Sequence, residues 1–148
     1  MTNLPPSHRR TLVDYLRRNA HELEDGLAYR FLETGDVDGV ISTLTFRQVE
    51  QRSLAIGATL AARGKPGDRA ILLYAPGLDF IMGFIGCLSA GMIAVSATPP
   101  DPSRIKRTLG QLRNIVADCE PRFIITTADF ARQARAMFGM APELAQLE

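Results

Sequence analysis

Five hydroxyl side chains follow or close three short apolar runs in the second half of the sequence. The runs cover residues 70–73, 92–95 and 123–125, and each has the pattern of a buried β-strand. Open parallel sheets bind ligands beyond the carboxyl ends of their strands, so these side chains could meet at one edge. The sequence favours a simpler role, in which they cap the helices that follow. The five are Tyr74, Ser96, Thr98, Thr126 and Thr127.

Three glycine-containing stretches come near known motifs, and each fails in a definite way. A Walker loop needs four residues between its glycines before the lysine, whereas Gly57 and Gly64-Lys65 lie too far apart. The turn at 75–77 holds one glycine where a dinucleotide fingerprint needs several. The segment 87–91 has cysteine where a serine elbow needs its first glycine, and it follows a helix. No pair of residues is a credible nucleophile and base.

The histidines and cysteines do not have the spacing of a catalytic site, a metal site or a disulfide. His8 and His21 are isolated, and we expect both at the surface. Cys87 and Cys119 lack CxxC spacing and sit among apolar residues. This pattern predicts buried thiols in a reducing compartment rather than a disulfide or a metal site.

The pattern of the charged residues also predicts an ordinary solvent-exposed surface. Asp36 and Asp38 lack the spacing of a calcium loop, which predicts a solvated turn. The net charge of +1 gives no electrostatic case for binding nucleic acid or an anionic membrane. One predicted helix is basic, and a solvated face is the favoured interpretation over a phosphate site. Its basic residues are Arg104, Lys106, Arg107 and Arg113.

The composition is that of a globular protein, with 148 residues, 46% of them apolar and 22% charged. Residues 80–100 carry no charge and are numerous enough to span a bilayer. The breaks at 89–91 and at Pro99-Pro100 instead predict a buried helix, a turn and a buried strand, with no membrane span. Residues 1–10 hold two prolines and no apolar signal core, so we expect a flexible start and a cytoplasmic protein.

The first third of the chain predicts a helix, a hairpin and a second helix. Ser7 is the expected cap of the first helix, which runs to about Leu23. Strands at 27–32 and 40–44 flank a glycine-rich turn and predict the β-hairpin. Thr45 and Gln48 have the spacing of a capping box. The helix behind them has apolar or small residues at alternating spacings of three and four, which are Phe46, Val49, Ser53, Ile56 and Leu60.

From Asp68 onward the order is β-α-β-α-β-α, with helices at 78–90, from Ser103 to 119, and at 129–138. This order predicts an α/β fold, a partial parallel sheet with flanking helices, behind the N-terminal hairpin. In the first of these helices we expect Gly83, Gly86 and Ala90 to allow close packing on the sheet. Residues 142–148 look like the start of another element, so we expect the sheet to continue in a longer protein.

Several stretches together resemble the N-terminal part of fatty acyl-AMP ligases, a branch of the adenylate-forming enzymes. The resemblance covers about residues 11–130. The pieces Pro76–Phe80 and Pro99-Pro100 favour this branch over acyl-CoA synthetases and peptide-synthetase adenylation domains. The other pieces are Leu44–Phe46, Gly67–Ala70, Leu72–Ala75, Gly86–Gly91, Ile93–Val95, Leu112–Asp118 and Ile125–Thr127.

The resemblance implies that residues 1–148 are an incomplete N-terminal subdomain of the large AMP-binding domain. Such enzymes join a fatty acid to ATP with Mg²⁺ and pass the acyl group from the adenylate to an acyl carrier protein, for lipid or polyketide assembly. Their phosphate loop, nucleotide contacts and catalytic lysine are expected further along the chain. No catalytic, cofactor-binding or metal-binding residue is therefore assigned here, and we expect the 148 residues alone to be inactive and to need no cofactor.

The sequence departs from the family pattern at three places. Ser89 and Thr98 stand where an aromatic residue is frequent, and Ser96 stands where proline is usual, which leaves the acyl-chain preference open. Two other interpretations also stay open. The chain could be the same segment of an acyl-CoA synthetase. It could also be a small non-enzymatic α/β module that binds a partner or a second copy through its sheet edge. As a ligase fragment, the chain could pair with a missing C-terminal part through the same edge.

Overall fold

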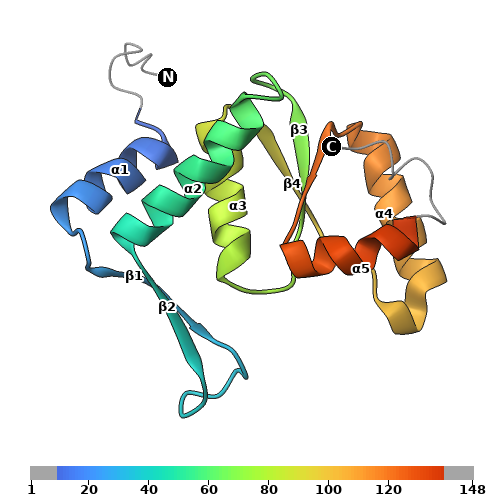
Figure 1. Cartoon of the computed structure of the whole chain (residues 1–148), viewed down its shortest axis with the longest axis horizontal. Helices are drawn as coiled ribbons and strands as arrows, with labels where there is room; N and C mark the ends of the chain where they lie inside the picture. The colour runs from blue at the N-terminus through green and yellow to red at the C-terminus, as the bar shows by residue number, and fades with distance from the viewer. Residues whose placement is uncertain (1–9, 139–148) are drawn as a thin grey trace, which may run out of the picture. The chain divides into compact units, whose positions relative to one another are not determined.

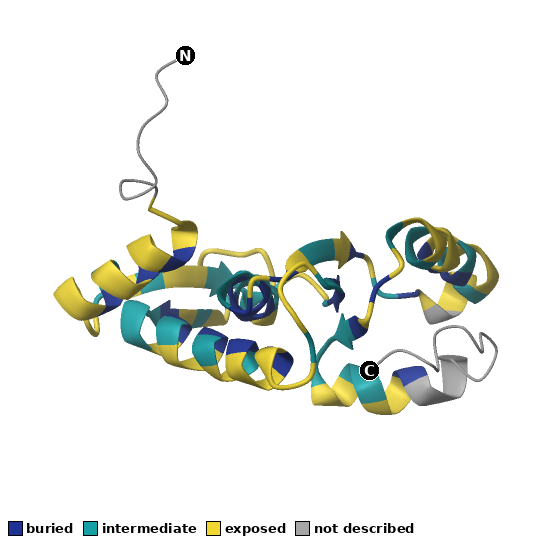
Figure 2. Ribbon diagram, turned by 90° about the horizontal axis from the view of Figure 1, so that it is seen from above, coloured by how far each residue is buried: buried dark blue, intermediate teal, exposed yellow. Residues whose placement is uncertain are grey.

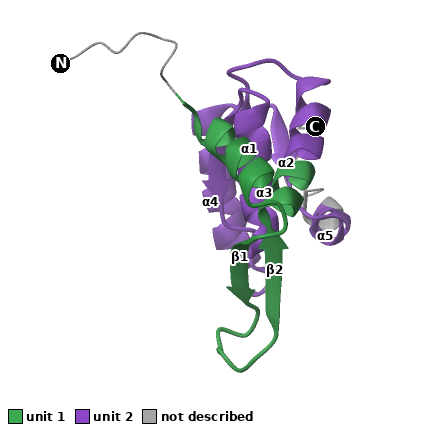
Figure 3. Ribbon diagram, turned by 90° about the vertical axis from the view of Figure 1, so that its left-hand side faces the viewer, with its two compact units in different colours: residues 1–52 green, residues 53–148 purple. Residues whose placement is uncertain are grey.

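A computed structural model describes residues 10–138, apart from the side chains of residues 102 and 135–138 (Figure 1). The chain divides into two compact units, residues 1–52 and 53–148, and the division falls inside one helix (Figure 3). The predicted flexible start at residues 1–10, apart from its last residue, and the predicted element at 142–148 lie outside the described residues.

The first unit opens with helix α1 (Leu12–Glu22). Its cap is Thr11, whose hydroxyl accepts a hydrogen bond of 3.2 Å from the Asp14 amide, while the Asp14 carboxylate accepts one of 2.8 Å from the Thr11 amide. This is a capping box with aspartate in the usual place of glutamate. The predicted cap at Ser7 is therefore wrong, and Ser7 itself lies outside the described residues.

Strands β1 (Leu27–Leu32) and β2 (Ile41–Thr45) form the predicted antiparallel hairpin. In the turn, the Asp36 carboxylate accepts a hydrogen bond of 3.1 Å from the Asp38 amide, which supports the prediction of a turn. Helix α2 (Phe46–Ala61) follows, and its predicted capping box is confirmed. The Thr45 hydroxyl and the Gln48 side chain accept hydrogen bonds from each other's amides at 3.2 and 3.0 Å.

The second unit contains the parallel sheet. Strand β3 lies between β4 and β5, in the order β4-β3-β5, and both pairs are parallel. Each strand is followed by a helix, as the sequence predicts, and a short 3₁₀ turn precedes α4 (Figure 1). The elements are β3 (Arg69–Leu73), α3 (Leu78–Ser89), β4 (Ile93–Ala97), η2 (Pro102–Arg104), α4 (Ile105–Cys119), β5 (Phe123–Ile125) and α5 (Ala128–Phe138).

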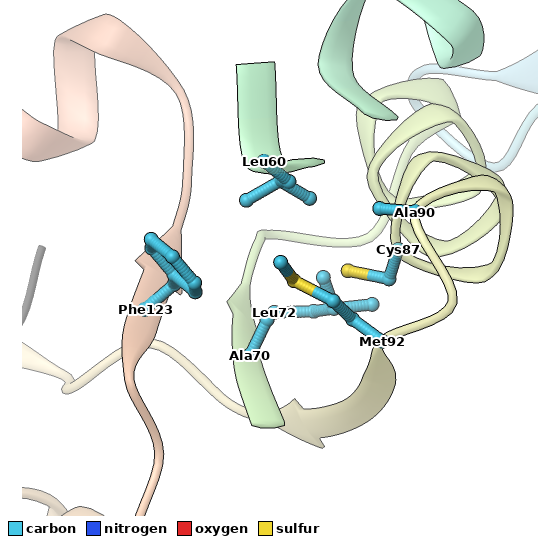
Figure 4. Packing of buried hydrophobic residues seen from close by; sticks show 7 residues of the cluster. All are labelled: Leu60, Ala70, Leu72, Cys87, Ala90, Met92 and Phe123. Carbon is cyan, nitrogen blue, oxygen red and sulfur yellow. The ribbon is translucent and has the colours of Figure 1, made fainter. Parts of the chain in front are cut away.

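Both faces of this sheet are covered, because β3 is apolar on both sides. Ala70 and Leu72 point to one face, where they join Leu60 of α2 and Cys87 of α3 (Figure 4). Residues 71 and 73 point to the other face, where α4 covers them with Leu109 and Leu112. All four β3 residues from 70 to 73 are fully buried. A central parallel strand has this pattern. Figure 2 colours the buried residues of the described chain dark blue.

Helix α3 is buried against protein, as predicted for the uncharged stretch. Within the described residues, no helix combines the length and the apolar character that crossing a bilayer requires. The expected role of its glycines needs correction. A Cβ atom on Gly86 would lie 2.6 Å from Ile56 of α2, and one on Gly57 of α2 would lie 3.0 Å from the Gly86 oxygen. These two glycines therefore allow α2 and α3 to approach each other, rather than letting α3 approach the sheet.

Candidate ligand edge of the sheet

The three parallel strands bring their carboxyl ends to one edge, where the sequence places five hydroxyls. Tyr74 directly follows β3, and Thr126 and Thr127 directly follow β5. Thr98 follows β4, but Ser96 lies inside that strand, opposite Leu72 of β3. The strand therefore extends two residues beyond its predicted end, and Ser96 is an exposed strand residue instead of a strand-end group.

The two threonines after β5 have different roles. Thr127 accepts a hydrogen bond of 3.2 Å from the Phe130 amide, so it caps α5 as predicted. Thr126 is no cap, because its hydroxyl donates a hydrogen bond of 2.5 Å to the main-chain oxygen of Leu73. Thr126 thus joins the carboxyl ends of β5 and β3, a role that the sequence did not reveal.

Tyr74 packs at the end of β3 against α3. A Cβ atom on Gly83 would lie 2.7 Å from the Tyr74 ring, so the glycine makes room for this tyrosine rather than for the sheet. Burial, with a smaller contribution from the Asp79 carboxylate, raises the pKa of Tyr74 above its usual value. The phenol therefore stays protonated near neutral pH and does not act there as a base.

Beyond β4, the crossover is held by Asp101 rather than by Ser103. The Asp101 carboxylate accepts hydrogen bonds of 2.8 and 2.7 Å from the amide and the hydroxyl of Ser103, so Asp101 caps the turn η2. No side chain caps α4 at its own N-cap, Arg104. The prediction that Ser103 caps this helix is wrong, because the turn intervenes. Thr98 is exposed and borders a groove beside α4.

Among residues 10–138, no three histidine, cysteine, aspartate or glutamate side chains gather where they could hold a metal. Burial raises the pKa of Cys87 to about 11 and also raises the pKa of Cys119, so both thiols are neutral near pH 7. At the edge, the hydroxyls of Thr126 and Thr127 are already engaged in hydrogen bonds within the protein.

The family described as AMP-binding enzyme matches residues 16–147 of this chain. The chain is 37% identical over 125 residues to the medium-chain-fatty-acid–[acyl-carrier-protein] ligase JamA of Moorena producens, covering 84% of this chain and 20% of that protein. It is 36% identical over 134 residues to the long-chain-fatty-acid–AMP ligase FadD32 of Mycolicibacterium smegmatis, covering 89% of this chain and 21% of that protein. The chain thus spans about a fifth of the length of these curated relatives.

The fold also matches a solved ligase. The fatty acid AMP ligase from Legionella pneumophila superposes with a TM-score of 0.76 at 35% identity, over 88% of this chain and 22% of the ligase. The resemblance to the N-terminal segment of fatty acyl-AMP ligases is confirmed by these matches. The chain belongs to the AMP-binding enzyme family.

Proposed function

We propose that residues 1–148 form the first part of the acyl-activating domain of a fatty acyl-AMP ligase. The match to the Legionella ligase carries this proposal, since it combines sequence identity with the same arrangement of elements. In the proposed reaction, a fatty acid carboxylate attacks the α-phosphate of ATP, pyrophosphate leaves, and an acyl-adenylate forms. Mg²⁺ neutralises phosphate charge in such reactions. The thiol of an acyl carrier protein then attacks the acyl carbonyl, an acyl thioester forms and AMP leaves, in the cytoplasm.

The contribution of this chain to that reaction is structural. Its hydroxyls at Thr126 and Thr127 hold strands and helices in place, and Tyr74 stays neutral, so we assign none of them a catalytic step. The 148 residues by themselves should bind ATP weakly or not at all and should form no acyl-adenylate. Residues that hold ATP and Mg²⁺ would come from other parts of a full ligase.

A chimera tests this proposal directly. Residues 16–147 would replace the matching segment of the Legionella ligase, and acyl-AMP and pyrophosphate would be measured with a fatty acid and ATP. We expect the chimera to form acyl-AMP, since its segment resembles the one it replaces. A chimera that is folded by circular dichroism but forms no acyl-AMP would count against the proposal and favour a non-enzymatic module.

The chain alone provides the matched control. Calorimetry with ATP should detect no tight binding, and no acyl-AMP should form under the same assay conditions. Tight ATP binding by the isolated chain would contradict the assignment of nucleotide contacts to other parts of a full ligase. Light scattering of the same sample would show whether the outer edges of β4 and β5 support pairing with a second copy.

A further inference from the structure

Strand β5 forms an open edge of the parallel sheet, because within residues 10–138 its one strand neighbour is β3. The Arg122 amide donates a hydrogen bond of 2.8 Å to the Arg69 oxygen, on the side of β3. Main-chain groups alternate in direction along a parallel strand, so those of Phe123 and Ile125 point away from β3. An edge of this kind offers N–H and C=O groups to another strand.

A groove of about 240 Å³ lies along this edge, between β5 and helix α2. Ile56 and the buried Leu60 line it from α2, and residues 123–125 line it from β5. Figure 4 shows Leu60 and Phe123, one from each side. Thr59 and Arg63, both exposed, complete the lining. An apolar groove beside free main-chain groups suits an added β-strand, which pairs through its backbone and buries alternate side chains.

The positions of the helices show from which direction such a strand comes. Helix α4 connects β4 to β5 across one face of the sheet, passing β3. Helix α5 lies on the same face, because Phe130 packs in the cluster that contains Leu109 and Leu112 of α4. Right-handed crossovers on one face move across a sheet in one direction. A strand that follows α5 therefore lies beyond β5, at the open edge, and not beside β4.

We propose that this edge and its groove receive a fourth parallel strand, supplied by the part of a full ligase that follows residue 148. The inference rests on the proposed function, since the chain spans about a fifth of its curated relatives and the ligase would supply the remaining length. The strand pairs with the outward main-chain groups of Phe123 and Ile125. Its apolar side chains on the side of α2 fill the groove against Leu60.

A second copy of the chain fits this edge less well. Strand β5 has three residues, so pairing between two copies would form few main-chain hydrogen bonds. A segment of the same polypeptide is held near the edge by α5, which gives it a high effective concentration. The short edge therefore favours a covalently connected strand.

Amide hydrogen exchange with residue resolution tests the proposal on the isolated 148-residue chain and on the chimera with the Legionella ligase. The Arg122 amide is the internal control, because it is bonded to β3 in both proteins. The amides of Phe123 and Ile125 should be protected only in the chimera. The ratio of their exchange rates to that of Arg122 should therefore be at least about tenfold lower in the chimera than in the isolated chain.

A variant that fills the groove provides a second test. Thr59→Trp should shift the unfolding temperature of the isolated chain by less than about 2 °C, since Thr59 is exposed there. In the chimera it should lower that temperature by about 3 °C or more, because tryptophan and the added strand compete for the same space. Ala58→Trp is the matched control at the neighbouring exposed residue of α2, outside the groove lining, and should have the same small effect in both proteins.

Three results would overturn the proposal. The first is equal exposure of the Phe123 and Ile125 amides in the chimera and in the isolated chain. The second is protection of these amides in the isolated chain, which would indicate another occupant. The third is equal losses for the two tryptophan variants in the chimera. A chimera that protects the amides but forms no acyl-AMP would contradict the proposed function alone, and an active chimera with exposed amides would contradict the added strand alone.

Discussion

The Thr126 hydroxyl donates a hydrogen bond of 2.5 Å to the main-chain oxygen of Leu73, a residue 53 positions earlier in the chain. The paired register of β3 and β5 ends just before this point, at Leu72 and Ile125. The Thr126 side chain therefore makes a hydrogen bond at the position where the next main-chain pair, Leu73 and Thr126, would continue the sheet. This contact ties the central strand to an edge strand at the end of the sheet where related folds bind ligands.

Thr126→Val should lower the free energy of unfolding by about 1–2 kcal/mol, because it leaves the part-buried Leu73 oxygen without its partner. Urea denaturation would measure the change. Thr126→Ser keeps the hydroxyl and should retain most of the stability. If valine and serine had equal effects, the hydrogen bond would not be the cause.

Gly86→Ala should destabilise the protein by about 1–3 kcal/mol, since the new methyl group would collide with Ile56 and the Ser53 oxygen. Gly110→Ala is the matched control in another helix, because no atom lies within 4 Å of its added Cβ. That variant should gain about 0.5–1 kcal/mol from helix propensity. Thermal unfolding should thus shift in opposite directions for the two alanines.

Leu72→Ala should cost about 2–5 kcal/mol, because Leu72 is fully buried in the central strand and its removal leaves a cavity. Ile93→Ala removes a similar volume from an edge strand where the side chain is 52% exposed. We expect a loss of no more than about 1 kcal/mol there. Urea denaturation would measure both losses, compared as shifts in the midpoint at an unchanged m-value. Similar losses at both positions would contradict the arrangement with β3 in the centre.

Cys87 makes stability sensitive to alkaline pH. Burial raises its pKa from 9.0 to about 11, so the folded state holds the thiol proton more tightly than the unfolded state does. This contribution is fully present below pH 9.0 and is lost as the pH rises toward about 11. The fall in unfolding free energy across this window should be smaller in Cys87→Ala than in the original protein. If the unfolding free energy fell equally with pH in both proteins, Cys87 would not be the cause of the alkaline loss of stability.

Much of the fold could be predicted because local patterns were unambiguous. Four consecutive apolar residues at 70–73 indicated a strand buried on both faces, and Thr45 with Gln48 indicated a helix start. The turn around Gly35 indicated the hairpin. These features depend on near neighbours in sequence, so a single chain was enough to reveal them.

Other features depended on partners that the sequence does not show. Helix α3 is apolar nearly all round, so its pattern could not say that Gly86 faces α2. Asp101 and Ser103 are both good caps, and only the backbone path of the crossover decides between them. At the candidate edge the sequence located Thr126 correctly, but its bond to a residue 53 positions away could not be read from local spacing.

The strand order β4-β3-β5 has a consequence for synthesis on the ribosome. The central strand is made first, and its two partners follow, ending 24 residues later at Ala97 and then 28 residues after that at Ile125. At roughly 5–20 residues per second, β3 waits on the order of one to several seconds for each neighbour. Its face formed by residues 71 and 73 also stays uncovered until α4 has been made. The nascent chain is most open to misassociation during this interval, before β4 and then β5 emerge.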